Sequence, residues 1–438
     1  MKRLLIQTQL SNYNTKGEFT LECDSGWQMT MGRVREMLKL VPDLHIDVMG
    51  PYIDLCDQYQ LVTPPHIVNP DLFIDYADRL RYIEHWIVPN ALATRYDFDY
   101  ESISNALKLH QHKEYSNKRY DAVLINDPMH LRNFKALFYL KGGYTPKFFV
   151  HSHFVDDPSC PKFPTEASLW LGQMEAAIKA DWNFWQCQST LDIVKQEMSK
   201  FYLPHVVDAV MAKSTPWDDG YSQTEMTNLE NLNKVRFDIK DVMRMKFSEK
   251  KIIIFVPNRI GGKGRSSDYT NCGKFMFEIL PELRKRRQDF VVIAGNPSQK
   301  IFNHELEKEC GQNGYISLVP DTFNRDEFKI IASFSDIAVG LYDQDSYGGT
   351  AARECIEMGC VPLWIDKYEY STLAKLANWP YIASDLGNNL VLMADALIET
   401  VKNKKHAEWI PKLQQVVRER CSYEATTPAM LKLMGLLQ

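Results

Sequence analysis

The sequence predicts an α/β protein made of two Rossmann-like, doubly wound domains that face a cleft. In both halves, short apolar runs alternate with longer stretches that carry apolar residues at helical spacing. A polar segment, 214–246, separates the two series. Strands that alternate with helices favour a parallel sheet covered on both faces. Each series therefore predicts one such sheet, with ligands bound between the two domains.

In the N-terminal series, helices and strands are predicted from the spacing of the apolar residues. The helix expected at 28–40 carries Met31, Val34, Met37 and Leu38 on one face. A second helix is expected at 165–180 and a third at 190–201. Short apolar runs between the helices predict strands at 3–8, 44–49, 121–126, 148–152 and 183–188.

The second series begins with the clearest buried strand in the chain, 251–256, which Pro257 ends. Further strands are expected at 290–294, 315–319, 337–341 and 361–365. Helices are expected at 272–287, 302–310, 326–334, 350–358, 388–403 and 411–420. The predicted organisation is an N-terminal domain, a linker, a second domain and a C-terminal helix that could return to the first domain: 1–213, 214–246, 247–410 and 411–438.

Composition excludes several classes of protein. The 438 residues are 45% hydrophobic and 24% charged, which is typical of a globular chain and not of a disordered, collagen-like or coiled-coil one. Lys and Arg number 51 and Asp and Glu 56, a net charge of −5, so any nucleic-acid site must be a local basic patch. The nine cysteines form no C-x-x-C pair, which predicts reduced thiols in a cytoplasmic protein. No apolar run is long enough for a membrane span.

The turn after the 251–256 strand is the first candidate site. It places Arg259 and Lys263 among three glycines, at the strand end where doubly wound sheets bind ligands. Glycines allow close approach of the backbone, and two cations suit a diphosphate. A surface loop with two solvated cations explains the same composition equally well.

A second candidate site follows the 337–341 strand. Gly348 and Gly349 precede a helix, whose free N–H groups attract phosphate, and Thr350 is a candidate cap. Glu354, one turn into that helix, could accept hydrogen bonds from both ribose hydroxyls. Asp345 precedes the glycines, where a carboxylate could meet sugar hydroxyls. A helix-capping loop with a solvated glutamate is the structural alternative.

Residues 250–365 resemble the nucleotide-binding domain of GT-B glycosyltransferases, in particular the retaining group that includes glycogen and sucrose synthases. Arg259 and Lys263 match the family's Arg and Lys in the loop after the first strand. The segment 345–362, DSYGGTAARECIEMGCVP, matches the family's E-x-F-G…E-A-x-x-x-G-x-P motif. The spacing is one residue longer than in the family, so either Asp345 or Ser346 takes the place of the first acid. Arg325 and the segment 334–339 match the family's R-x-x-L…A-D-V-x-V.

The resemblance implies a role for each site residue. Arg259 and Lys263 neutralise the leaving diphosphate, and Glu354 anchors the ribose. Asp345 and a histidine at the end of the 148–152 strand orient the sugar; His153 is the first choice and His151 the second. The remaining nucleotide-sugar contacts come from Gly348, Gly349 and Thr350 and, for the base, from Pro320 and Phe323.

The function implied is a glycosyltransferase, hexosyl or pentosyl, that uses a nucleoside-diphosphate sugar, such as a UDP-sugar, with retention of configuration. The D-x-D strings at 97–99 and 343–345 are chance matches at this acid content, and no metal or other cofactor is expected. The acceptor is either a saccharide or envelope glycan, or 5-hydroxymethylcytosine in phage DNA, in which case the protein would act in the host cytoplasm. The alternative is a non-catalytic nucleotide-sugar-binding protein.

Overall fold

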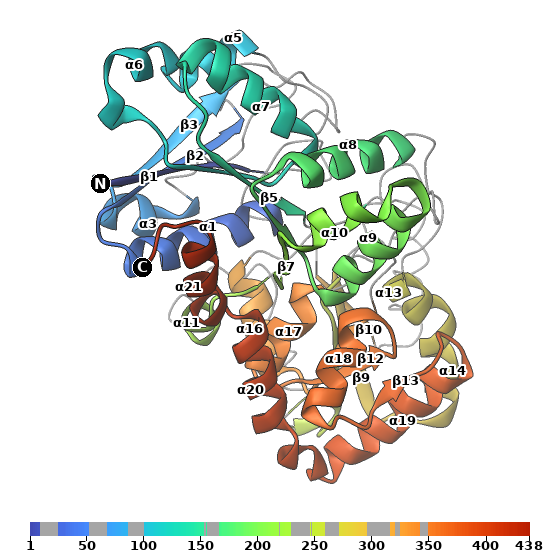
Figure 1. Ribbon diagram of the computed structural model, residues 1–438. Coiled ribbons are helices and arrows are strands. Elements are labelled where there is room, and N and C mark those ends of the chain that lie inside the picture. Colours follow the sequence, from blue (N-terminus) through green and yellow to red (C-terminus); the bar gives the residue numbers. More distant parts are fainter. Residues whose placement is uncertain are drawn as a thin grey trace. The chain divides into compact units, whose positions relative to one another are not determined.

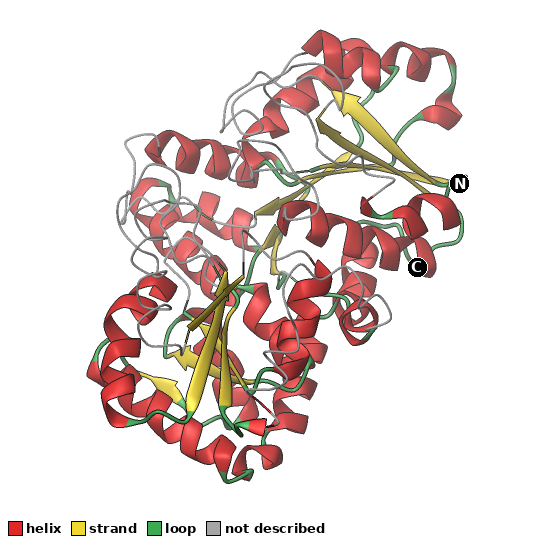
Figure 2. Cartoon of the chain, turned by 180° about the vertical axis from the view of Figure 1, so that it is seen from behind, coloured by secondary structure: helices red, strands yellow, loops and turns green. Residues whose placement is uncertain are grey.

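The computed structural model describes residues 1–8, 25–51, 68–85, 100–152, 155, 166–218, 220–228, 246, 248–258, 271–295, 316–319, 325–341 and 349–438. The chain divides into two compact units (Figure 1). Unit 1 comprises Met1–Asp219 with Thr426–Gln438, and unit 2 comprises Gly220–Ala425. Each unit contains one parallel sheet flanked by helices (Figure 2), so the predicted α/β class is confirmed.

The sheet of unit 1 has seven parallel strands in the order β3-β2-β1-β4-β5-β6-β7. The sequence-based positions of β1, β2, β4, β5 and β6 are confirmed to within a few residues. The strands are β1 (Lys2–Gln7), β2 (Leu44–Pro51), β3 (Leu80–His85), β4 (Ala122–Ile125), β5 (Lys147–Ser152), β6 (Trp182–Trp185) and β7 (Ser214–Pro216).

Alternating side chains of this sheet enter two separate cores. Leu4 and Ile6 of β1 join the cluster formed with α1, while Leu5 between them joins the cluster on the other face. Both faces are therefore covered, as a parallel sheet requires. The helices are α1 (Ser25–Leu40), α3 (Pro70–Asp75), α5 (Tyr100–Ala106), α6 (Leu109–Glu114), α7 (Leu131–Leu137), α8 (Glu166–Lys179), α9 (Gln188–Phe201) and α10 (Pro204–Met211).

Unit 2 has six parallel strands in the order β10-β9-β8-β11-β12-β13 around one core cluster. They are β8 (Ile252–Val256), β9 (Phe290–Gly295), β10 (Ile316–Val319), β11 (Ile337–Gly340), β12 (Val361–Ile365) and β13 (Ile382–Ala383). Its helices include α11 (Gln223–Thr227), α13 (Asn271–Lys274), α14 (Leu280–Arg286), α16 (Arg325–Phe334), α17 (Thr350–Glu357), α18 (Tyr368–Ala377), α19 (Asn388–Lys402) and α20 (Ile410–Cys421).

The structure differs from the sequence-based expectation in the polar segment and in the helix expected at 272–287. Residues 214–216, assigned to the linker, form the edge strand β7, and α11 lies in the same polar segment. The helix expected at 272–287 contains a π-helical stretch, Phe275–Ile279, just before Pro281. Proline cannot donate the helical hydrogen bond and crowds the preceding turn, which a π-helical stretch relieves. The helix expected at 302–310 lies outside the described residues.

The C-terminal segment crosses from one unit to the other. Helix α20 belongs to unit 2, whereas α21 (Tyr423–Leu433) carries the chain into unit 1. There Met430 and Leu431 are buried in the core cluster that contains α1. The Lys2 Nζ atom donates to the Leu436 carbonyl at 2.8 Å, which brings the two ends of the chain together. Unit 1 is thus completed by the last residues of the sequence.

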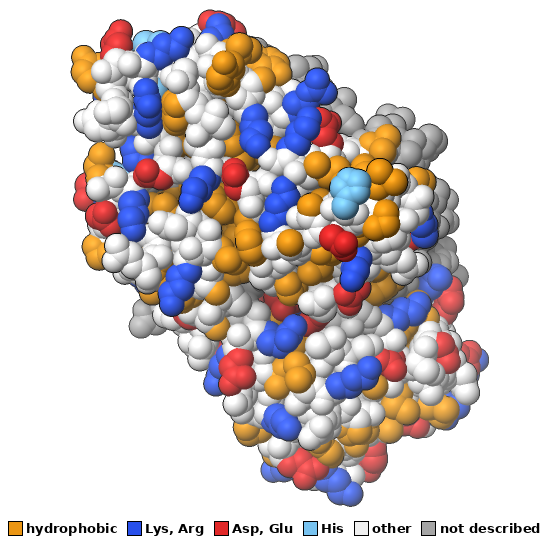
Figure 3. All heavy atoms as spheres, viewed as in Figure 1, with side chains coloured by type: hydrophobic (Ala, Val, Ile, Leu, Met, Phe, Trp, Pro, Cys, Tyr) orange, Lys and Arg blue, Asp and Glu red, His pale blue; other side chains and the backbone are white. Residues whose placement is uncertain are grey.

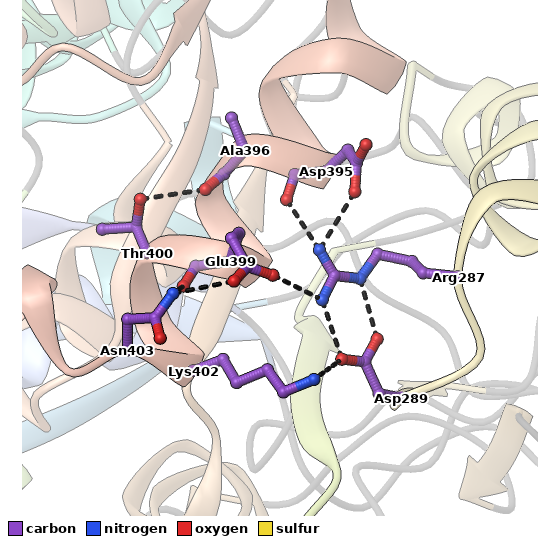
Figure 4. Close-up of polar contacts among 8 residues, drawn as sticks. All are labelled: Arg287, Asp289, Asp395, Ala396, Glu399, Thr400, Lys402 and Asn403. Carbon is purple, nitrogen blue, oxygen red and sulfur yellow. Dashed lines mark hydrogen bonds and ion pairs between the residues drawn. The ribbon is translucent and has the colours of Figure 1, made fainter.

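An ion-pair cluster fixes α14 against α19 at the amino end of β9 (Figure 4). The Arg287 guanidinium donates to both carboxylate oxygens of Asp289 at 2.7 Å and to Asp395 Oδ1 at 3.0 Å. Glu399 Oε2 lies 3.3 Å from the same guanidinium, and Lys402 Nζ lies 2.8 Å from Asp289. Hydrogen bonds from Arg287 hold the pKa of Asp289 well below its usual value; burial opposes this shift and Lys402 reinforces it.

Replacing Asp289 tests this cluster. Because its folded-state pKa is depressed, Asp289 contributes stability above its ordinary pKa, and that contribution is lost as pH falls toward the folded-state value. Asp289→Asn should lower the free energy of unfolding by about 1–2 kcal/mol at neutral pH and flatten the loss of stability below about pH 4. Thermal melts across this pH range measure both effects. Asp208→Asn, at an exposed position of α10, is the control; an equal effect there would contradict the assignment.

Candidate functional site

The strand order reverses once in each sheet, and the predicted site loops begin at that point in unit 2. There β8 lies between β9 and β11, so the chain leaves β8 and β11 toward opposite faces. In a doubly wound sheet this arrangement opens a crevice at the carboxyl ends of the two strands. Residue 259 follows Val256, the end of β8, by three positions. Residues 342–348 begin two positions after Gly340, the end of β11.

Many of the predicted site residues lie outside the described residues. They are His153, Arg259, Lys263, Pro320, Phe323, Asp345, Ser346 and Gly348. Their roles stay predictions, since the structure describes only the strands and helices that flank them. Gly349, Thr350, Glu354 and His151 are described.

The start of α17 is held in place by aromatic packing. Gly349 is its N-cap residue, with φ −72° and ψ 142°, and Thr350 is the first helical residue, so the glycine rather than the threonine caps this helix. The Tyr370 hydroxyl donates to the Gly349 carbonyl at 3.4 Å, and the Tyr370 ring stacks on Trp364 at 5.0 Å between centroids. The free N–H groups of this helix end are therefore fixed beside β11 and β12.

The end of β11 approaches α17 too closely for any side chain. A Cβ added at Gly340 would lie 2.8 Å from Trp364 Cδ1 and 2.9 Å from Ala352 Cβ. Both contacts are shorter than real Cβ atoms show, so this position requires glycine. The close approach places the first turn of α17 against the carboxyl end of the sheet.

Glu354 is buried within a three-residue ion-pair system. Its side chain is 9% exposed, and Oε1 lies 2.7 Å from Arg325 Nη2. Arg325 Nε donates to Glu225 Oε1, also at 2.7 Å, and the guanidinium lies 5.7 Å from the Phe328 ring centroid. Burial tends to lower the pKa of Arg325, but the two carboxylates outweigh it and raise the pKa well above its usual value. The contact with Arg325 is made through Oε1 of Glu354.

Removing Arg325 tests this ion-pair system. Arg325→Met would leave two carboxylates without their shared cation, and we expect a loss of about 3 kcal/mol in the free energy of unfolding. Urea denaturation monitored by tryptophan fluorescence measures the loss. Arg325→Lys, which keeps one charge but not the two-sided geometry, should lose less. Unchanged stability in the methionine variant would show that the ion pairs contribute nothing.

A buried polar cluster occupies the corresponding edge of unit 1. Gln7 at the end of β1 and Asn126 and Asp127 after β4 meet where that strand order reverses. Gln7 Nε2 donates to Asp127 Oδ2 at 2.9 Å, and Asn126 Nδ2 donates to the Gln7 carbonyl at 2.9 Å. His151 of β5 joins them: its Nδ1 lies 3.1 Å from Arg33 Nη1 and 3.3 Å from Asn126 Oδ1.

This cluster contains residues that the sequence analysis did not select. His151, its second choice, is fully buried here. Arg33, Gln7, Asn126 and Asp127 were not considered, although the strands that carry or precede the last three gave a signal. The apolar runs of β1 and β4 both end in polar residues, and carboxyl ends of neighbouring parallel strands meet at one edge. Arg33 gave no such signal, because it lies within a helix.

Metal-binding clusters and membrane-spanning helices were the two remaining features of interest. Within the described ranges, no group of three or more His, Cys, Asp or Glu side chains is arranged to hold a metal ion. A search of the same ranges for helices long and apolar enough to cross a bilayer also found none.

No model of a known protein family matches the sequence, and no curated protein matches it. The fold of the chain is, however, similar to that of several solved structures. The Anabaena protein Alr3699/HepE in complex with UDP has a TM-score of 0.63 at 10% identity, over 100% of both chains. A glycosyltransferase from Rickettsia africae has 0.64 at 12% identity, over 99% of this chain and 98% of the other. Sucrose-phosphate synthase from Thermosynechococcus elongatus has 0.63 at 11% identity, over the same shares.

These similarities extend over the whole chain and establish its fold. The two parallel α/β sheets are those of the GT-B fold, as the resemblance of the motifs implied. At such low identity the fold alone is shown, because one fold supports many activities.

Proposed function

We propose that this protein transfers a sugar from a UDP-sugar to an acceptor hydroxyl. One observation carries the proposal: β8 and β11 are neighbours where the strand order of unit 2 reverses. The loop that contains Arg259 and Lys263 and the segment that leads to α17 therefore start from the same edge of the sheet. The similar structures support a UDP-sugar donor, since HepE is bound to UDP or UDP-glucose and the E. coli trehalose-6-phosphate structure holds UDP-2-fluoro glucose.

The proposed chemistry assigns leaving-group stabilisation to unit 2. The bond between the anomeric carbon and the diphosphate oxygen breaks, and the diphosphate leaves with the electron pair. The acceptor oxygen bonds to the anomeric carbon and gives its proton to the leaving diphosphate, so UDP is released. Arg259 and Lys263 offset the charge that develops on the diphosphate, and the N-terminus of α17 adds oriented N–H groups. Asp345 orients the sugar, and retention follows from the family resemblance.

Glu354 is proposed to hold the ribose. A buried carboxylate one turn into α17, held by Arg325, can accept hydrogen bonds from both ribose hydroxyls. Pro320 and Phe323, which follow β10, are proposed to contact the base. In unit 1, His151 or His153 is proposed to face the sugar. The side chain of His151 is fully buried and contacts Asn126 at the carboxyl edge of the sheet, the edge at which doubly wound sheets bind ligands.

The two cations provide the direct test of enzymatic activity. Arg259→Ala and Lys263→Ala should each reduce turnover at least about 100-fold, because each removes charge stabilisation of the leaving group. Release of UDP from a panel of UDP-sugars measures the reaction and identifies the donor. Arg286→Ala, at an exposed position near the amino edge of the same sheet, is the control. Near-normal turnover in both site variants would contradict the assignment, and donor binding without turnover would indicate a binding protein.

The role of Glu354 can be separated from that of its partner Arg325. Glu354→Gln should weaken UDP binding about 10- to 100-fold. This factor corresponds to the free energy that hydrogen bonds to a charged group contribute. Glu225→Gln removes a carboxylate from the same guanidinium but leaves Glu354 in place, so it should bind UDP almost normally. Calorimetric titration with UDP measures both. Equal weakening in the two variants would mean that Glu354 acts only through Arg325.

The acceptor is proposed to be a saccharide, and hydroxymethylated phage DNA is the alternative. On the face seen in Figure 3, the Lys and Arg side chains of the described residues are scattered among uncharged and acidic ones. That face supports a saccharide more than a nucleic acid, which requires clustered cations. Retention on duplex DNA that falls steeply with salt would favour the DNA acceptor. Salt-independent behaviour with transfer to a glycan would favour the saccharide.

A further inference from the structure

The buried contact between Arg33 and His151 fixes the chemical form of this histidine. Arg33, on α1, is 3% exposed and His151, on β5, is fully buried. The Arg33 Nη1 atom lies 3.1 Å from His151 Nδ1. A guanidinium has hydrogen-bond donors only, so Nδ1 must act as an acceptor. We infer that Arg33 keeps His151 neutral, with its hydrogen on Nε2, and is therefore a positioning residue.

A second contact at the same nitrogen favours the opposite tautomer. Asn126 Nδ2 donates to the Gln7 carbonyl at 2.9 Å, and this orients Asn126 Oδ1 toward His151 Nδ1 at 3.3 Å. An oxygen acceptor there would prefer a hydrogen on Nδ1. The two contacts cannot both be satisfied, because Nδ1 either carries a hydrogen or accepts one.

The arginine contact prevails on distance and charge. It is the shorter of the two, at 3.1 Å against 3.3 Å, and a hydrogen bond from a charged donor is stronger than one between neutral groups. A hydrogen on Nδ1 would also point at the N–H group of a cation. Protonation of the ring would have the same effect and would bury a second positive charge beside Arg33.

Arg33 is held in this position from a second direction. Its guanidinium lies 5.4 Å from the centroid of the Trp217 ring, close enough for a cation–π contact. The strand β6 beside β5 places the uncharged Phe184 opposite His151. Among the described residues, the buried titratable side chains that follow the strands at this edge also include Asp127, His130, Cys187 and Asp218. Asp127 Oδ2 accepts from Gln7 Nε2 at 2.9 Å.

This tautomer determines what His151 can do. With the hydrogen on Nε2 and Nδ1 engaged by Arg33, the ring can donate a hydrogen bond but cannot remove a proton from a ligand. If the proposed sugar transfer holds, His151 is a donor to an oxygen of the sugar rather than a general base. That step rests on the proposed function, whereas the tautomer itself does not.

Nitrogen-15 NMR of protein labelled at histidine reads the tautomer directly in the full chain. The His151 signals are assigned by their loss in His151→Gln. We expect the Nε2–H form in the wild type, without protonation between about pH 5 and 8. In Arg33→Met the ring should move its hydrogen to Nδ1, because the contact that remains at that nitrogen is the acceptor oxygen of Asn126. Arg33→Lys, which still offers a charged donor, should restore the Nε2–H form.

A wild-type ring that carries its hydrogen on Nδ1, or that protonates within this range, would overturn the inference whether or not the protein transfers sugar. The tautomer and its pH dependence are read on the wild type, and a variant is used only to assign the signals. Where turnover is measured, Arg33→Met should lower kcat about 10- to 100-fold through misorientation of the ring, with a smaller change in KM for the donor. Arg33→Lys should recover part of this loss. A pH profile of kcat that is identical in wild type and Arg33→Met would also contradict the assignment.

Discussion

The reversal of strand order in each sheet is the constraint on which both candidate sites depend. Parallel strands are joined by right-handed crossovers. The connecting helices therefore move to the other face of the sheet only where the strand order reverses. That change occurs at β1 in unit 1 and at β8 in unit 2. In doubly wound sheets this arrangement opens a crevice at the carboxyl edge, where polar side chains can be placed without breaking the apolar layers. The polar residues of both candidate sites are therefore expected at the carboxyl edges of the two sheets.

Two ion-pair systems of unit 2, one around Arg287 and one around Arg325, have different roles at the two edges of its sheet. At the amino end of β9, Arg287 connects Asp289 to α19 and stabilises the packing of helices. Near the carboxyl end of β11, Arg325 joins Glu225 to Glu354 and fixes a carboxylate beside the proposed ribose site. The first system maintains the fold. The second places one oxygen of Glu354 in a defined position, as expected for a group that must meet a ligand without reorganisation.

The Arg33–His151 pair shows the same principle in unit 1. A buried cation next to an imidazole sets the position of a hydrogen, which neither residue determines alone. Together with Glu354, it suggests that each unit supplies one fixed polar group from its own edge. The arginines in both cases act through a neighbour and need not contact a ligand themselves.

The sequence by itself determined the elements that depend on local pattern. The apolar run Ile252–Val256 predicted β8, and the helical spacing after Gly349 predicted α17, because strand and helix periods are properties of neighbouring residues. The motifs around Arg259 and Glu354 likewise pointed to a nucleotide-sugar donor. Helix α17, with Glu354, is described at the expected edge, whereas the position of Arg259 stays a prediction.

Only the tertiary structure decided which distant residues meet. Arg33 and His151 are 118 positions apart, and Arg325 and Glu225 are 100 apart. The edge strand β7 forms from three residues of a polar segment because β6 offers a free edge for pairing, and the residues from Thr426 onward join unit 1 because its core cluster takes in Met430 and Leu431. Such contacts depend on the order of strands in space, which periodicity does not encode.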